Sequence, residues 1–306
     1  MRRETVEILS ALVSPQRGMH SVTADCFHDM QPGERQSCWV VQEQALRLEV
    51  AQVGDYTLMC TPTGSAEASG FTPDEGVLGD AAIPGALALA AGFLFTEGFI
   101  RTLADVASMA ICPQSLTLVK VHLVEAQQVR TDRRSGVVAS SCGVCGNLDH
   151  LPDSWTASSP VSDTLPVPPA QLHRHMLTMR QHQLLFSHTG GTHAAALFNS
   201  GGALLATAED LGRHNALDKA IGHCLLHNQP TAASCAVLSG RISLEMILKA
   251  ARAGIEVMAA VSAPSSLAIE VARRNNISLC GFVREDRLTV FTHPQRLSTL
   301  NTLRRR

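Results

Sequence analysis

The second half of the chain alternates apolar runs with amphipathic stretches. Three mainly apolar runs are typical of buried strands: CAVLS (235–239), IEVMAAVS (255–262) and ISLCGFV (277–283). Between them, residues 243–254 and 264–276 have apolar side chains at helical spacing, with Gly254 closing the first helix and Pro264 opening the second. Strands and helices that alternate over such short connections predict an α/β layered fold with right-handed crossovers.

Further strand patterns flank this region. HAAALFN (193–199) and ALLATAED (203–210) lie on either side of a Ser-Gly-Gly turn and predict a hairpin. Asp210 is placed to cap the helix that follows it. RLTVFTH (287–293) predicts a last strand, so we expect a mixed sheet with antiparallel pairing at its edges.

The first half of the chain reads as mainly β. Its strand-like runs are CWVV (38–41), LRLEV (46–50), YTLMC (56–60), LTLVKVHLV (116–124) and SGVVAS (135–140). One buried helix is predicted over residues 84–97, and residues 64–80 are predicted to form an exposed loop.

The pattern divides the chain into four parts. Residues 1–34 lack periodicity and are predicted to be a loose extension, followed by a mainly β domain over residues 35–146. Residues 147–170 are rich in Ser, Pro and Asp and are predicted to be a linker. Residues 171–300 form the predicted α/β domain.

Charge and composition exclude several classes of protein. The 25 basic and 27 acidic residues nearly balance, so no overall field favours nucleic acid or a membrane surface. The most apolar stretch, residues 83–95, is too short to span a bilayer, and the N-terminus lacks the pattern of a secretory signal. Nine cysteines, of which one pair is closely spaced, argue against a disulfide framework. We therefore expect a cytoplasmic protein.

The paired cysteines, in SSCGVCG (140–146), are the first candidate for chemistry. A structural zinc site requires four ligands, and no second Cys-x-x-Cys is present in the sequence to complete one. His150, His193 and His214 are possible further ligands. A zinc deaminase has its His-x-Glu before its cysteines, whereas here the best histidine, His193, follows them and precedes alanines. The pattern therefore argues against deamination, while structural zinc stays open.

A thiol function is the other interpretation of this pair. In a thioredoxin-type site a helix lowers the pKa of the first thiol, but GNLDHLPDSW (146–155) cannot continue a helix. Gly143 and Gly146 and the adjoining polar linker favour an exposed loop, which suits a cysteine that carries sulfur between partners. The residues alone leave three hypotheses open: a carrier or redox thiol, structural zinc, and an incidental pair.

The carboxyl ends of the predicted strands are the second candidate site. These ends are Ser239-Gly240-Arg241, residues 262–265 and residues 282–287. Ligands of open α/β sheets bind at such ends, where helix N-termini at Ser239 and Ser262 would attract phosphate. In residues 282–287, two arginines follow a phenylalanine, which suits a nucleotide. The alternative is ordinary helix capping and paired surface charges.

Several blocks of the sequence match one known family. The blocks are SSCGVCG (140–146), GFLFTEGFI (92–100), GGTHAAALF (190–198), EDLGRHNALDKAIG (209–222), LSGRISLEMILKAARAGI (238–255), AVSAPSSLAIEVA (260–272) and GFVREDRLTVFTHPQRL (281–297). Through them the chain resembles the FdhD family of formate dehydrogenase accessory sulfurtransferases, over residues 37–297.

This resemblance implies a function. A family member accepts sulfur from a cysteine desulfurase and transfers it to the bis-guanylyl molybdenum cofactor that the formate dehydrogenase catalytic subunit then receives. Cys142 would bear the persulfide and Cys145 would assist it. The segment that would bind the cofactor, with GDP as a mimic, consists of Phe282, Val283, Arg284, Glu285, Asp286 and Arg287.

The resemblance also implies a cytidine-deaminase-like C-terminal domain, a homodimer, and no metal site of the protein's own. His193, Arg213 and His214 are candidates for assisting the transfer, or else for binding backbone carbonyls. Alternative functions are a cofactor-binding chaperone in which the thiols are dispensable, and a dithiol or zinc module.

Overall fold

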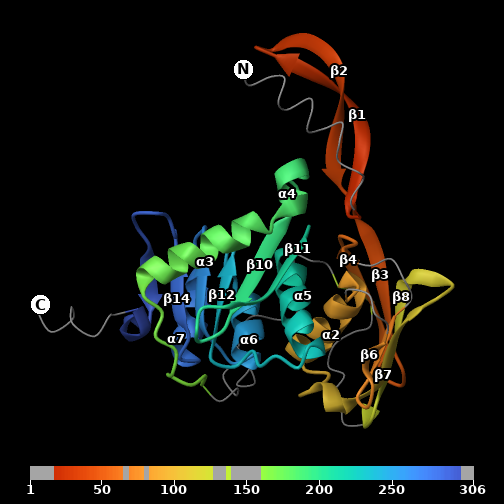
Figure 1. Cartoon of the computed structure of the whole chain (residues 1–306), viewed down its shortest axis with the longest axis vertical. Coiled ribbons are helices and arrows are strands. Elements are labelled where there is room, and N and C mark those ends of the chain that lie inside the picture. The colour runs from red at the N-terminus through yellow and green to blue at the C-terminus, as the bar shows by residue number, and fades with distance from the viewer. Residues whose placement is uncertain (1–16, 65–68, 79–82, 127–135, 139–159, 298–306) are drawn as a thin grey trace, which may run out of the picture.

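A computed structural model describes residues 17–64, 69–78, 83–126, 136–138 and 160–297 of the 306-residue chain. They form two large mixed sheets and a separate hairpin (Figure 1). The predicted mixed α/β class is confirmed.

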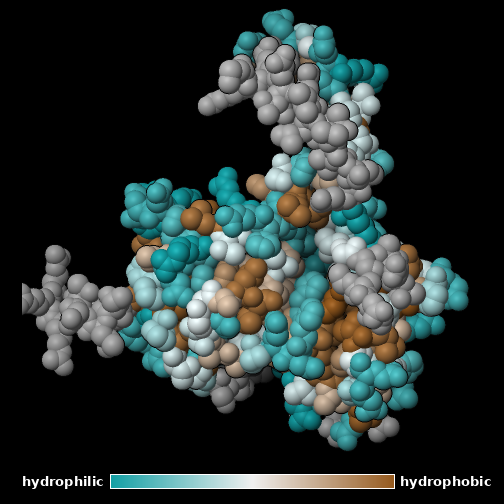
Figure 2. Space-filling model, in the orientation of Figure 1, coloured by the Kyte–Doolittle hydropathy of each residue, from teal (hydrophilic) through white to brown (hydrophobic). Residues whose placement is uncertain are grey.

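The hairpin is formed by β1 (Met19–His28) and β2 (Gln31–Val41), which pair antiparallel. It extends away from the two larger sheets (Figure 1) and carries mainly hydrophilic side chains (Figure 2). Asp29 and Met30 turn the chain with φ values of 50° and 62°. The prediction of a loose extension is therefore wrong for residues 19–34, because an Asp-Met turn lacks the glycine that usually marks such a turn. Residues 1–16 lie outside the described part.

The larger sheet has seven strands in the order β6-β5-β7-β8-β3-β4-β9. Their bounds are β3 (Gln44–Val50), β4 (Gly54–Cys60), β5 (Gly70–Thr72), β6 (Gly76–Leu78), β7 (Val106–Cys112), β8 (Ser115–Leu123) and β9 (Gly136–Val138). A short 3₁₀ helix, η1 (Leu103–Asp105), precedes β7. The predicted exposed loop at 64–80 is wrong in part, because β5 joins the sheet and buries Phe71.

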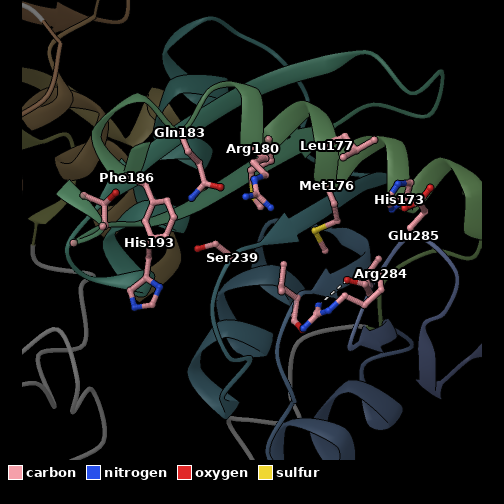
Figure 3. Close-up of a pocket in the computed structure, with 16 residues that line it drawn as sticks. His173, Met176, Leu177, Arg180, Gln183, Phe186, His193, Ser239, Arg284 and Glu285 are labelled. Carbon is pink, nitrogen blue, oxygen red and sulfur yellow. Dashed lines mark hydrogen bonds between the residues drawn. The ribbon is translucent and has the colours of Figure 1, made fainter. Parts of the chain in front are cut away.

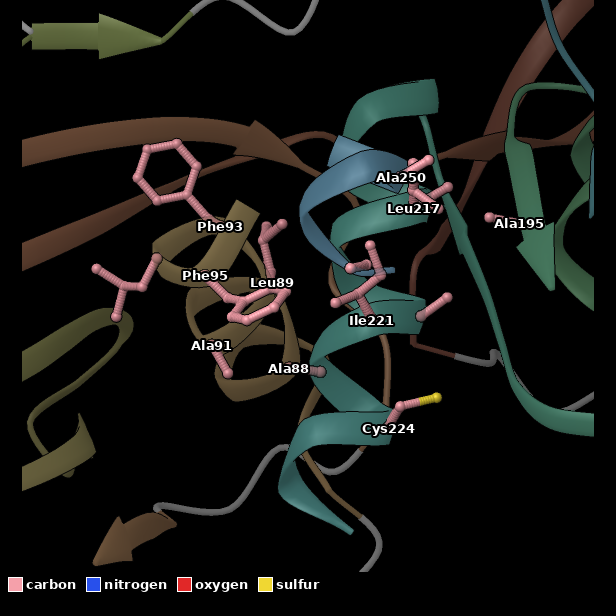
Figure 4. Packing of buried hydrophobic residues seen from close by; sticks show 14 of the residues in the cluster. Ala88, Leu89, Ala91, Phe93, Phe95, Ala195, Leu217, Ile221, Cys224 and Ala250 are labelled. Atoms are coloured by element: carbon pink, nitrogen blue, oxygen red, sulfur yellow. The ribbon is translucent and has the colours of Figure 1, made fainter. Parts of the chain in front are cut away.

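One apolar helix joins the two halves of the molecule. α2 (Gly85–Glu97) confirms the predicted helix and is buried all round. It packs against α5 (Arg213–Leu226), and Figure 4 shows apolar side chains of both helices meeting between them. A Cβ on Gly92 would lie 1.8 Å from the carbonyl oxygen of Asp218, and one on Gly222 would lie 1.8 Å from that of Ala88. Glycine at these two positions lets the helix backbones touch.

The second sheet has six strands in the order β11-β10-β12-β13-β14-β15. Their bounds are β10 (His193–Phe198), β11 (Leu204–Asp210), β12 (Ser234–Leu238), β13 (Ile255–Ala260), β14 (Ser278–Gly281) and β15 (Thr289–Thr292). β12, β13 and β14 run parallel, whereas β10, β11 and β15 pair antiparallel at the edges. These strands confirm the pattern predicted from the sequence.

Helices cover both faces of this sheet. α3 (Pro169–Gln181) lies over one face, where Leu172 and Met176 pack against Ala196 and Val237. On the other face lie α5, α6 (Leu244–Arg252) and α7 (Ser266–Arg274). Alternate strand residues thus enter different cores, which explains why the strand sequences are mainly apolar and do not alternate with polar residues. Two short elements complete the set: α4 (Leu184–Thr189) follows α3, and η4 (Pro294–Leu297) follows β15.

The described end of the predicted linker is packed rather than free. Leu165 and Val167 are buried, and the buried carboxylate of Glu256 accepts hydrogen bonds from Ser162 and Thr164. The linker prediction is therefore wrong for residues 161–168, because this segment satisfies a charge inside β13. Residues 147–159 lie outside the described part. In the described chain, no helix is long and apolar enough to cross a membrane.

Candidate functional site

A pocket of about 720 Å³ lies where β12, β13 and β14 end. Because the three strands are parallel, their carboxyl ends meet at one edge of the sheet and bring Ser239, Val261 and Val283 together. This is the edge at which the sequence predicted a ligand. The volume lies within the range of small-molecule sites.

Residues distant in sequence form the opposite wall of this pocket. Met176 and Arg180 of α3 and Gln183 and Phe186 beside and within α4 line it, and Figure 3 shows them above the strand ends. Sequence reasoning missed these residues. The apolar spacing in α3 indicates a helix, but nothing in the pattern says which edge of the sheet that helix covers.

A buried carboxylate fixes this wall of the pocket. Glu209, in β11, accepts hydrogen bonds of 2.8 Å from the backbone N–H groups of Leu185 and Phe186. Its Oε1 also accepts a 2.8 Å bond from the hydroxyl of Thr192. Glu209 therefore ties the start of α4 and the Gly-Gly-Thr turn to the sheet. This turn lies beside the hairpin, since a Cβ on Gly191 would lie 2.8 Å from a methyl group of Val41.

Three of the six residues predicted in the 282–287 segment line the pocket: Val283, Arg284 and Glu285. Arg284 Nη1 donates 2.9 Å hydrogen bonds to the carbonyl oxygens of Val261 and Val283. The Arg284 backbone N–H donates to the carbonyl of Arg287 at 2.8 Å, which closes a turn. Arg284 thus holds its own loop against the end of β13 and partly uses its donors to do so.

The other three residues of the segment are not among the pocket residues. Phe282 has a φ of 53°, is 43% exposed and lies 6.4 Å from the ring of Phe291. Asp286 and Arg287 are exposed. Their binding role stays a prediction.

The predicted helix N-termini are displaced from the strand ends. α6 begins at Leu244 and not at Ser239, whose hydroxyl instead accepts a 2.8 Å hydrogen bond from the backbone N–H of Ala194. Ser239 therefore joins β12 to β10. α7 begins after Ser265, whose hydroxyl accepts a 3.2 Å bond from the N–H of Ala268, so Ser262 opens no helix either. The reason is that loop residues separate each strand from its helix.

A second polar network lies behind the pocket. Asp210 and Lys219 form an ion pair of 2.7 Å with side chains 0% and 1% exposed. Lys219 Nζ also donates to the carbonyl of Thr61 at 2.7 Å, and Asp210 accepts from the Thr61 N–H at 3.0 Å. Asp210 also accepts from the backbone N–H of Gly212 at 2.9 Å, just before α5. The network joins the end of β4 to the start of α5.

The strand that leads to the paired cysteines ends beside this network. Val138, in β9, pairs with Leu58 of the parallel strand β4, and Thr61 directly follows the last residue of β4. Cys142 and Cys145 themselves lie outside the described residues, as does His150.

Three cysteines outside the pair, Cys224, Cys235 and Cys280, are buried in the cores. Burial raises the pKa of Cys224 and of Cys280 to about 12, and it also raises the pKa of Cys235. These thiols stay protonated near neutral pH and are poor nucleophiles. Among the described residues, no group of three or more His, Cys, Asp or Glu side chains is arranged to hold a metal ion.

Comparisons with known proteins agree on one family. The model of the FdhD/NarQ family matches residues 81–298. The chain is 36% identical over 266 residues to a sulfur carrier protein FdhD of Bordetella bronchiseptica, covering 86% of this chain and 88% of that one. It is 40% identical over 228 residues to a protein of the same name from Anaeromyxobacter dehalogenans, covering 68% of this chain and 78% of that one.

A solved structure has the same fold. It is the crystal structure of a protein described as a formate dehydrogenase accessory protein, from Desulfotalea psychrophila. The TM-score is 0.68 at 22% identity, with 92% of this chain and 99% of that chain covered.

Proposed function

Because this chain belongs to the FdhD/NarQ family, we propose that it is a sulfur carrier whose sulfur-bearing residue is Cys142. The relatives at 36–40% identity are named sulfur carrier proteins, and the matched regions include most of this chain. In this proposal the chain acts as a sulfurtransferase that provides the sulfur required for formate dehydrogenase activity.

The first step loads sulfur onto Cys142. The Cys142 thiolate attacks the outer sulfur of a persulfide on a cysteine desulfurase. A new S–S bond forms at Cys142 as the donor's S–S bond breaks, and the donor cysteine leaves as a thiolate. No oxidant is needed, because one thiolate replaces another.

The second step releases the sulfur. The Cys145 thiolate attacks the inner sulfur of the Cys142 persulfide, forms a disulfide with Cys142 and expels hydrosulfide. The hydrosulfide is delivered to the metal of the bis-guanylyl molybdenum cofactor, which is the substrate. A dithiol reductant then regenerates both thiols.

The described residues would bind and orient this substrate. The pocket combines the apolar walls of Met176 and Val283 with the donors of Arg180, Arg284 and Ser239. This mixture suits a nucleotide, whose base is flat and partly apolar and whose phosphates are anionic. The volume of about 720 Å³ suits one guanylyl unit, and GDP is the simplest mimic.

The direction of β9 is the observation that carries the proposal. Its carboxyl end points to the same end of the seven-stranded sheet as Thr61, and Thr61 is hydrogen bonded to Asp210. Asp210, in β11, lies opposite His193 of the antiparallel strand β10, and His193 lines the pocket. Val138, the last residue of β9, thus lies at the end of the sheet that is joined to Asp210, and it precedes Cys142 by four positions in the sequence, as delivery of sulfur to a bound substrate requires.

Complementation tests this function. In a strain that lacks its own family member, the wild-type chain should restore formate dehydrogenase activity, whereas Cys142→Ser should not. Cys112→Ser is the matched control, because Cys112 is a partly exposed cysteine in β7. Full activity with Cys142→Ser would instead support a chaperone that binds the cofactor without carrying sulfur.

Several finer features stay proposals. They are the cysteine desulfurase and the formate dehydrogenase catalytic subunit as partners, a homodimer, a cytoplasmic location and a deaminase-like arrangement of the second half of the chain.

A further inference from the structure

An apolar surface adjoins the mouth of the pocket. Leu177 of α3 and Leu184 and Phe186 of α4 are 47%, 52% and 44% exposed. Leu177 and Phe186 also line the pocket, and Figure 3 shows them in one row along the same side of it, with Arg180 between them. Figure 2 shows apolar side chains gathered at the surface over α4, at the base of the hairpin. A patch of large exposed apolar side chains is a common mark of an interaction site.

The same surface is basic. Residues 164–208 contain no Asp or Glu, whereas Arg174 and Arg180 are exposed on α3. Neither arginine forms an ion pair with another residue that the structure describes. On a chain with a net charge of −2, this region therefore attracts acidic groups. We call the surface the α3–α4 face and define it by Arg174, Leu177, Arg180, Leu184 and Phe186.

The fold does not require apolar side chains on this face. α3 already buries Leu172, Met176 and Met179 against the six-stranded sheet, which is the contact that holds the helix in place. The face is also held in a defined position, because Glu209 accepts hydrogen bonds from the start of α4. A surface that is already ordered loses little conformational entropy when a partner binds.

The position of the face selects the kind of partner. In the proposed function, the formate dehydrogenase catalytic subunit takes the molybdenum cofactor from this pocket. A protein that takes a ligand from a pocket has to approach its mouth, and the α3–α4 face forms one side of that mouth. A desulfurase needs access to Cys142 instead. A membrane fits less well, because recognition of anionic lipid typically uses clusters of about 4–8 basic residues.

We propose that the α3–α4 face is the docking surface for the formate dehydrogenase catalytic subunit, which binds it through an apolar segment flanked by acidic side chains. The inference rests on the proposed function, in which this pocket holds the cofactor. Leu184 and Phe186 are the apolar anchors, and they cover an area at the centre of the contact. Arg174 and Arg180 pair with the acidic side chains of the partner, so binding weakens as the salt concentration rises.

Biolayer interferometry tests this surface with the full chain and the cofactor-free formate dehydrogenase catalytic subunit from the same organism. The double variant Arg174→Glu/Leu184→Ser changes two exposed residues of the face that do not line the pocket. Its affinity for the catalytic subunit should fall roughly tenfold or more, because it loses an apolar anchor and reverses a charge.

The control carries the same two substitutions elsewhere. Arg273→Glu/Leu78→Ser changes an exposed arginine of α7, on the other face of the six-stranded sheet, and an exposed leucine of β6 in the other sheet. This control should bind the catalytic subunit as the wild type does. An equal loss of affinity in both double variants would overturn the assignment of the face.

Two further measurements show whether the double variant is folded and otherwise active. Arg174→Glu/Leu184→Ser should keep the thermal shift with GDP and the sulfur loading of Cys142 by a desulfurase. The single variant Arg174→Glu should weaken binding by roughly threefold or more at low salt, and its difference from the wild type should shrink at high salt. A single variant that binds like the wild type at low salt would overturn the role of charge.

The outcomes separate this inference from the proposed function. Unchanged affinity in Arg174→Glu/Leu184→Ser would overturn the docking surface, while sulfur loading of Cys142 would leave the proposed function intact. A wild-type chain that binds the catalytic subunit through this face but takes up no sulfur would support the surface and count against the carrier function.

Other occupants of the face give different results. If the double variant converts a dimer to a monomer in analytical ultracentrifugation, the face belongs to a second copy of the chain and the proposal is overturned. If the double variant loses only sulfur loading, the face belongs to the desulfurase. Binding of the wild type to anionic vesicles that the double variant loses would assign the face to a membrane. Both of these results would also overturn the proposal.

Discussion

Gly92 of α2 lies directly against the backbone of Asp218 in α5, so that a Cβ at Gly92 would be 1.8 Å from the Asp218 carbonyl oxygen. The substitution Gly92→Ala must therefore push the two helices apart. We expect the free energy of unfolding, measured by chemical denaturation, to fall by about 3 kcal/mol or more, the upper end of the range that is typical of overpacking. Gly201→Ala is the control, because its closest neighbour, Asn199 Oδ1, is 3.3 Å away at an exposed turn. Equal stability of both variants would contradict this close contact.

The ion pair between Asp210 and Lys219 gives a second prediction. Both side chains are fully buried, so Lys219→Met leaves the Asp210 carboxylate without its cation. We expect this variant to lose about 3–5 kcal/mol of unfolding free energy. The double variant Asp210→Asn/Lys219→Met should lose clearly less than the sum of the single changes. Strictly additive losses would show that the two groups do not interact.

The third prediction concerns Arg284. GDP should raise the melting temperature of the wild-type chain, and Arg284→Ala should weaken GDP binding by about 1.5–3 kcal/mol. Both the charge and the bonds to Val261 and Val283 are lost in this variant. Arg287→Ala is the control, since Arg287 does not line the pocket. If GDP raised the melting temperature of Arg284→Ala as much as that of the wild type, Arg284 would not be part of the binding site.

The fourth prediction is a pH dependence of stability. His175 stacks on Phe198 at 3.8 Å, and burial, with a smaller effect of Arg174, lowers its pKa from about 6.5 to about 4. The unfolded chain takes up this proton near pH 6.5, whereas the folded chain does not. Stability should therefore be lost as the pH falls from 6.5 to 4, by up to about 1.4 kcal/mol per pH unit.

The variant His175→Phe should make this slope shallower, because the ring stays stacked but no longer titrates. His182→Phe, at an exposed position at the end of α3, should keep the wild-type slope. Urea denaturation at several pH values measures both. Identical slopes in His175→Phe and the wild type would contradict the assignment.

The alternating strands and helices of the second half were predictable because the physical signal is local. Val257 and Met258 are both fully buried but enter different cores, so a strand covered on both faces appears as a mainly apolar run. The position of the pocket followed from the same pattern, since parallel strands end at one edge.

The parts that could not be predicted depend on contacts between distant segments. Met176 and Arg180 reach the pocket through the position of α3, which no local pattern specifies. Glu256 was a signal that could have been used: a charge inside an apolar run needs donors, and Ser162 and Thr164 in the predicted linker supply them. The family resemblance, and not spacing, supplied the roles of Cys142 and Cys145.

Intact-protein mass spectrometry tests the central claim most directly. The purified, reduced chain is incubated with a cysteine desulfurase and cysteine, and the modified residue is located by peptide mapping. The wild type and Cys112→Ser should gain the mass of one sulfur atom at Cys142, reversed by a dithiol reductant. Cys142→Ser should gain none. A wild-type chain that gains no sulfur, or that gains it equally after Cys142→Ser, would contradict the carrier function.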